Sequence, residues 1–174
     1  IMNLLKDGGR AGVVLPDGFM FGDGVKNTIK EKLLKEYGLH TIIRLPQVFK
    51  PYANVNTNLL FFKKGVVSRG VWFYRLDYPE GVKSFSKTKP IQDKHFDPVR
   101  EWWDNKQAIV VNGFDKARFY TPEELEALNY DFDKCCPFPH TEEEILEPKD
   151  LITRYEAERA ELNASIDRIL ASIT

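Results

Sequence analysis

The order of apolar runs in residues 10–64 most constrains what this chain can fold into. Residues 11–15 form a short apolar run bounded by glycine and proline, which is typical of a buried strand in the middle of a parallel sheet. Residues 25–37 repeat apolar side chains at four-residue steps, which predicts an amphipathic helix. Residues 39–45 and 57–63 predict two more strands. The pattern therefore indicates an α/β fold that contains a parallel strand–helix–strand crossover.

Two finer expectations follow from the same pattern. In the predicted helix, Val25 falls in the apolar stripe and Lys30 on the polar faces. Residues 71–77 are rich in aromatic side chains and follow a glycine-containing connection, which predicts a fourth strand, antiparallel to the third and beside it.

The chain divides into three parts by composition. Residues 1–78 carry the predicted sheet, and residues 79–148 are polar and irregular with short helices. One of these helices starts where Thr121 precedes a proline, because threonine caps helices and proline suits their first position. Residues 149–174 keep apolar side chains at helical spacing without glycine or proline, which predicts a long helix whose apolar face approximates a heptad seam.

Composition excludes several classes of protein. A length of 174 residues suits one main domain with an appendage, and a net charge of −1 gives no electrostatic sign of a free-standing DNA-binding protein. Cys135 and Cys136 are adjacent, so a disulfide framework is not expected, and with His140 they lack the second ligand pair of a zinc site. The sequence has no membrane-spanning run or secretory signal. We therefore expect a soluble cytoplasmic protein without a metal, and residues 1–6, which read as the end of a helix, suggest a truncated chain.

Three stretches carry a resemblance to a known family. Residues 8–17, 41–46 and 57–65 resemble the second half of amino-methylating DNA methyltransferases, and more narrowly the modification subunit of type I restriction-modification systems. Residues 128–133, an acidic stretch and the terminal helix are similar to the end of such subunits. The resemblance implies the C-terminal half of a Rossmann-like sheet, S-adenosylmethionine as cofactor, and adenine in DNA as substrate.

The same resemblance implies partners, and it implies that this chain lacks part of the methyltransferase site. The partners would be DNA, a specificity subunit that reads the DNA sequence, and a restriction subunit. The glycine-containing cofactor loop and the Asn-Pro-Pro-Phe/Tyr turn of the family do not occur in the 174 residues. We therefore expect no catalytic residue here and no methyl transfer by this chain alone, although the full-length protein would be an adenine-specific DNA methyltransferase.

The loop at residues 46–56 holds the main candidates. The resemblance assigns Phe49 to stacking on the extruded target base, with Tyr52 in reserve; alternatively, either ring only fastens the loop to the sheet. Further substrate or DNA contacts are expected from short polar groups and from the end of the first strand, where open α/β sheets bind ligands. These residues are Pro16, Asp17, Asn54, Asn56, Thr57 and Asn58. Their alternative roles are loop capping and a strand-ending turn.

The terminal helix leads to a second hypothesis. The resemblance implies that Leu162, Ile166, Ile169 and Ile173 pack on the specificity subunit, although the helix could instead fold back on its own domain. In the alternative reading the chain is a non-catalytic interaction module that presents this helix to a partner. An exposed sheet edge would also favour self-association.

Overall fold

The computed structural model describes residues 1–134 apart from Gly22, Pro51, Asn54 and Lys83, and eight residues of the C-terminal segment. Those eight are Ile152, Tyr155, Glu156, Arg159, Ala160, Leu162, Asn163 and Ile166. The chain divides into two units, Ile1–Pro139 and His140–Thr174. Among the described residues, no helix has the length and apolar character needed to cross a membrane, and no cluster of His, Cys, Asp or Glu is arranged to hold a metal.

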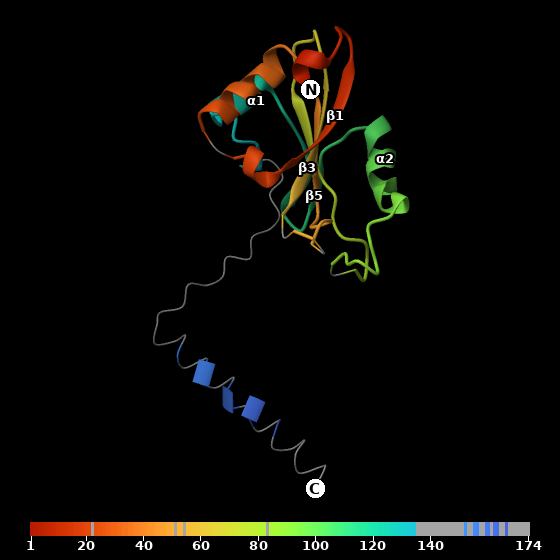
Figure 1. Cartoon of the computed structure of the whole chain (residues 1–174), viewed down its shortest axis with the longest axis vertical. Helices are drawn as coiled ribbons and strands as arrows, with labels where there is room; N and C mark the ends of the chain where they lie inside the picture. Colours follow the sequence, from red (N-terminus) through yellow and green to blue (C-terminus); the bar gives the residue numbers. More distant parts are fainter. Residues whose placement is uncertain are drawn as a thin grey trace. The chain divides into compact units, whose positions relative to one another are not determined.

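Six strands form one mixed sheet in the first unit, in the order β1-β3-β2-β4-β6-β5 (Figure 1). Their bounds are β1 Arg10–Pro16, β2 Thr41–Leu45, β3 Thr57–Lys63, β4 Val71–Arg75, β5 Ile109–Val111 and β6 Phe114–Tyr120. β2 and β4 are parallel neighbours, whereas the other four neighbouring pairs are antiparallel. The predicted α/β class is therefore confirmed, with a mixed rather than a parallel sheet.

The strand order corrects two expectations. β1 lies at an edge of the described sheet, with alternating exposed and half-buried residues, and not in its middle. β1 and β2 do run in the same direction, but β3 returns between them and is antiparallel to both. β3 suits this inner position because it is apolar on both faces, with Leu60 in one core and Leu59 against the other. β4 consequently pairs in parallel with β2 and does not lie beside β3.

A third correction concerns the segment predicted to be irregular. β5 and β6 form a hairpin within it, and β6 extends the sheet by pairing with β4. Ala117 on β6 is completely buried, so this hairpin belongs to the core of the first unit. The sequence of residues 114–120 does not alternate apolar and polar residues, so it carries no clear strand pattern.

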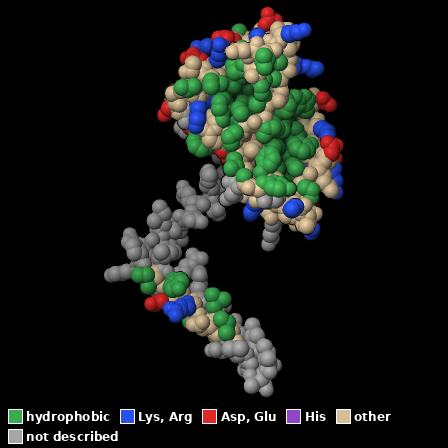
Figure 2. Space-filling view, viewed as in Figure 1, with side chains coloured by type: hydrophobic (Ala, Val, Ile, Leu, Met, Phe, Trp, Pro, Cys, Tyr) green, Lys and Arg blue, Asp and Glu red, His purple; other side chains and the backbone are tan. Residues whose placement is uncertain are grey.

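Helices cover both faces of the sheet, and Figure 1 shows α1 (Val25–Lys35) and α2 (Asp97–Asp104) on opposite sides. Leu33 of α1 and Leu125 of α3 (Pro122–Ala127) pack in one core with Leu60 and Phe73. Trp102 of α2 packs in the other core with side chains of β2, β4 and β6. The sheet is thus the middle of three layers, and hydrophobic side chains still gather on its surface in the view of Figure 2.

α3 confirms its predicted start, and α1 buries Leu33 of its predicted apolar stripe, but two other residues of α1 differ from the prediction. The Thr121 hydroxyl accepts a hydrogen bond from the Glu124 backbone, so α3 begins at the predicted cap. In α1, Val25 is 77% exposed and Lys30 is completely buried, opposite to expectation. Lys30 Nζ donates to the Met20 carbonyl at 3.0 Å and lies 5.5 Å from the Phe132 ring centre. A buried polar partner therefore turns a lysine towards the core.

Four short 3-10 turns complete the first unit: η1 Met2–Leu4, η2 Asp17–Phe19, η3 Asp93–Phe96 and η4 Phe132–Lys134. In the second unit the eight described residues are helical. Four of them are large apolar side chains that are more than half exposed, namely Ile152, Tyr155, Leu162 and Ile166. Ile169, Ile173, Cys135, Cys136 and His140 lie outside the described residues.

Candidate substrate-binding edge of the sheet

Most of the predicted site residues lie at the end of the sheet where β1, β2 and β4 finish, and this end is called the ligand edge. Pro16 and Leu45 both pair with Thr57, so the carboxyl ends of β1 and β2 meet the amino end of β3. β4 runs parallel to β2, and Arg75 lies opposite Arg44, so its carboxyl end is at the same edge. Ligands of open α/β sheets bind beyond the carboxyl ends of strands. The topology therefore gathers the loop between β2 and β3, η2 and the segment after β4 at the edge where substrates bind.

The loop between β2 and β3 is anchored by groups other than its two candidate rings. Val48 packs against the core on the α2 side, and the Gln47 backbone N–H donates to the Tyr78 hydroxyl at 3.2 Å. The Phe49 carbonyl accepts the backbone N–H groups of Tyr52 and Ala53, each at 2.7 Å, which closes a tight turn. Phe49 remains 44% exposed and Tyr52 79% exposed. Both rings therefore keep surface that a base could cover.

Arg44 organises the polar groups at this edge. Its guanidinium donates to Asp17 Oδ2 at 2.9 Å and to Asp133 Oδ1 at 2.6 Å, and Asn58 Nδ2 donates to Asp17 Oδ1 at 2.6 Å. Burial by itself lowers the pKa of Arg44, but the hydrogen bonds and charges of Asp17 and Asp133 outweigh it and raise the pKa overall. The network fixes η4 against the ends of β1 and β2.

Arg44 and Asp133 were not predicted from the sequence as members of this network. The available signal was a single charged residue within the apolar run Thr-Ile-Ile-Arg-Leu, because a charge inside a buried strand requires partners. Asp133 is 89 residues away in sequence, and no local pattern connects it to Arg44.

The expected polar contacts differ in their accessibility. Asn58 is 2% exposed and bonded to Asp17, and Thr57 is 7% exposed, so both side chains belong to the interior of the edge. Asp17 is committed to Arg44 and Asn58. Pro16 is exposed and Asn56 half-buried, with the Asn56 carbonyl accepting the Asp17 N–H at 3.0 Å. Asn54 lies outside the described residues. Of the expected contacts outside the two aromatic rings, Pro16 and Asn56 are therefore the described residues that a ligand could still reach.

His40 and Lys106 form a polar contact that lies apart from the loop. His40 precedes β2 at the opposite end of the sheet, where its Nδ1 lies 2.8 Å from Thr41 Oγ1. Burial, with a contribution from the charge of Lys106, lowers the pKa of His40. Lys106 donates to the same Thr41 hydroxyl at 2.6 Å and lies over the Trp103 ring. This arrangement is a buried polar contact between β2 and the segment after α2.

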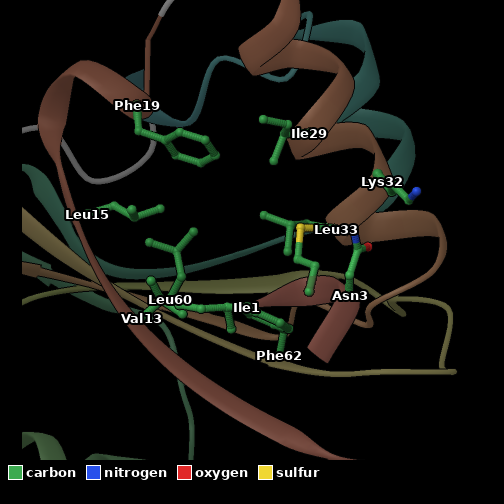
Figure 3. A pocket seen from close by; sticks show the side chains of 11 residues that line it. Ile1, Asn3, Val13, Leu15, Phe19, Ile29, Lys32, Leu33, Leu60 and Phe62 are labelled. Atoms are coloured by element: carbon green, nitrogen blue, oxygen red, sulfur yellow. The ribbon is translucent and has the colours of Figure 1, made fainter. Parts of the chain in front are cut away.

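An apolar cavity of about 390 Å³ lies between β1 and α1 (Figure 3). Leu15 from β1, Leu60 from β3 and Ile29 from α1 point into it, and η1 closes one side. Asn3 and Lys32 are its polar lining residues. Ligand sites normally combine an apolar lining with convergent polar groups, and this cavity offers few, so we assign no ligand to it.

The fold is that of an α/β protein whose candidate ligand groups lie beyond the carboxyl ends of its strands, and comparison with known proteins gives the family. Residues 1–144 match the model of the N-6 DNA methylase family, so the chain belongs to that family. Members of the family use S-adenosylmethionine. The predicted resemblance is thereby confirmed.

Individual relatives and solved structures show which proteins of this family the chain is similar to. The chain is 41% identical over 165 residues to the type I restriction enzyme EcoEI methylase subunit of Escherichia coli, covering 93% of this chain and 34% of the relative. A crystal structure of the EcoKI M protein shares 27% identity with a TM-score of 0.61, covering 76% of this chain and 35% of that one. A structure on complex assembly of a type I restriction-modification system shares 30% identity with a TM-score of 0.63, covering 94% and 35%. The chain thus spans about a third of the length of these relatives.

Proposed function

We propose that this chain forms part of a DNA methyltransferase that transfers a methyl group from S-adenosylmethionine to the exocyclic amine of adenine. It would act within a cytoplasmic type I restriction-modification complex and would be inactive alone. Family membership supports the reaction, and the observation that carries the site is the exposed Phe49 ring on an anchored loop at the ligand edge of the sheet.

Phe49 would stack on the adenine after the base leaves the duplex. A base in a duplex is inaccessible to such an enzyme, so the base must rotate out and rest on an aromatic or apolar surface. The alternative role, fastening the loop to the sheet, is already performed by Val48 and by the bond from Gln47 to Tyr78. Tyr52 follows on the same turn and is the second candidate, with Pro16 and Asn56 as neighbouring contacts.

The described edge does not itself supply a cofactor site. A carboxylate that accepts hydroxyl groups of a nucleoside would be the expected ligand, but Asp17 is bonded to Arg44 and Asn58. We therefore assign no residue of this chain to S-adenosylmethionine and derive no catalytic step from it.

Replacing Phe49 by alanine in the complete methyltransferase tests the proposal. Base–aromatic stacking contributes roughly 1–3 kcal/mol, which corresponds to about a 5- to 150-fold loss in methylation of a duplex substrate. Affinity for S-adenosylmethionine should hardly change. Phe114→Ala is a matched control, because Phe114 has the same 44% exposure but lies on the β5–β6 hairpin. Unchanged methylation by Phe49→Ala, or equal losses in both variants, would contradict the assignment.

A second function is favoured by the exposed apolar residues of the terminal helix. Ile152, Tyr155, Leu162 and Ile166 follow steps of three, seven and four residues, close to heptad spacing. We propose that this stripe, continued by Ile169 and Ile173 in the sequence, packs on the specificity subunit, through which the restriction subunit and DNA would join the complex. Deleting residues 149–174 should abolish co-purification with the specificity subunit. Retained co-purification would refute this role without affecting the stacking proposal.

A further inference from the structure

A second hollow lies at the same edge of the sheet, beyond the carboxyl end of β4. It is a cavity of about 370 Å³ formed by three separate segments. Asp77 and Tyr78 come from the chain after β4, Lys94 and His95 from η3, and Lys116 from β6. Its lining is more polar than that of the cavity beside α1, and it includes both basic and acidic side chains.

The carboxylates of this hollow are already neutralised by neighbouring cations. Asp77 accepts from Arg75 Nε at 2.8 Å and lies 3.2 Å from Lys116 Nζ. Asp97 accepts from Arg100 at 2.7 Å. Lys94 is exposed and forms no ion pair with any residue that the structure describes. Because Arg100 also binds Asp93, the four cations Lys94, Lys116, Arg75 and Arg100 face three carboxylates. One positive charge, that of the exposed Lys94, is left without a carboxylate among the described residues, and a ligand anion is its natural partner.

Hydrogen-bond donors are also held in place there. The His95 Nδ1 accepts the Gln92 backbone N–H at 3.0 Å, so the ring carries its proton on Nε2 and can donate it. The Tyr78 hydroxyl accepts from Gln47 and keeps its own hydrogen to donate. The buried Phe85 ring lies 5.4 Å from both the Tyr78 and the His95 rings, which restricts their movement. A charged amine and two oriented neutral donors match the oxygen atoms of a phosphate.

The hollow adjoins the loop that carries Phe49. Gln47, two residues before Phe49, donates its backbone N–H to Tyr78, whose side chain lines the hollow. In Figure 1 the loop after β2 and the segment after β4 lie at the same end of the sheet. A nucleotide stacked on Phe49 would have its flanking backbone phosphates within the neighbourhood of these donors.

We propose that this hollow, with Lys94, His95 and Tyr78, binds a backbone phosphate of the DNA strand that carries the extruded adenine. The proposal rests on the proposed methyltransferase function and adds a contact beyond the aromatic loop. Lys94 supplies the charge, and the bond from Tyr78 to Gln47 links phosphate binding to the position of the loop. Phosphate contacts of this kind set the register of a protein on DNA without reading sequence.

Lys94→Ala in the complete methyltransferase, assayed for affinity to a duplex at several salt concentrations, tests the contact. Loss of one phosphate contact lowers the slope of log affinity against log salt by about 0.9. The affinity deficit of the variant should therefore shrink about 3.5-fold between 50 and 200 mM salt. Lys63→Ala is the matched control, because Lys63 is an exposed lysine at the opposite end of the sheet and should keep the wild-type slope.

Neutral methylphosphonate linkages locate the phosphate. At one position beside the target adenine, the methylphosphonate should weaken wild-type binding and leave Lys94→Ala binding unchanged. A wild-type salt slope for Lys94→Ala, or equal losses with every methylphosphonate in both proteins, would overturn the inference. Such a result is distinguishable from failure of the proposed function, in which the wild-type enzyme itself would neither bind nor methylate the duplex.

Discussion

Replacing Arg44 by methionine should destabilise the first unit far more than removal of an ordinary surface arginine. The Arg44 side chain is 11% exposed and bridges Asp17 and Asp133, whose side chains are 16% and 33% exposed. Methionine fills similar space but leaves two carboxylates without their cation. Breaking a buried ion pair in this way costs about 3–5 kcal/mol, because the remaining charge is buried without compensation.

The structure places the expected loss near the lower end of that range. Asp17 keeps the hydrogen bond from Asn58, and Asp133 can regain water. We therefore expect a loss of about 3 kcal/mol in the free energy of unfolding, which lowers the urea midpoint by about 1–3 M with an unchanged slope. The melting temperature should fall by about 6–12 °C.

Urea unfolding of the chain, monitored by the fluorescence of Trp72, Trp102 and Trp103, measures this loss. Arg100→Met is the matched control, because Arg100 also binds two aspartates, Asp93 and Asp97, but on the surface. Its midpoint should hardly move, since exposed ion pairs contribute little. Equal midpoints for the two variants would show that the network around Arg44 does not hold η4 against the sheet.

Two further predictions test the packing. Gly70 has a φ of 130°, and a Cβ there would lie 2.7 Å from the backbone oxygen of Tyr120 as well as 2.1 Å from Phe119 Cζ, so Gly70→Ala should cost about 2–6 kcal/mol in urea unfolding. Gly113→Ala, with a φ of 80° and open space, should cost only about 1–2 kcal/mol, and a similar loss at both positions would refute the clash. Burial lowers the pKa of Lys30 against the opposing charges of Asp131 and Asp23, so below its unfolded pKa of about 10.4 the unfolded chain binds more protons. The stability of wild type relative to Lys30→Met should therefore rise from pH 8 towards pH 10, and a flat or falling difference would mean that Lys30 keeps an ordinary pKa.

The position of the aromatic loop could be predicted from local sequence. The loop of residues 46–56 combines exposed aromatics with a position after a strand, and the structure finds it at the ligand edge. Asn58 was also named as a ligand contact, but an asparagine that binds substrate and one that bonds to Asp17 look alike in sequence. Lys94 and Tyr78 were not named, because their segment has no periodic pattern and becomes a site only through contact with the loop.

Sequence alone determined the family, the three strands before Lys64, and the start of α3, because apolar periodicity, caps and motifs are local properties. Tertiary structure alone decided that β3 lies between β1 and β2, that β6 extends the sheet, and that Lys30 faces the core. These outcomes depend on which surfaces meet, and an apolar strand is compatible with several neighbours. The partners of a buried charge, such as Asp133 for Arg44, are likewise fixed only when distant segments come together.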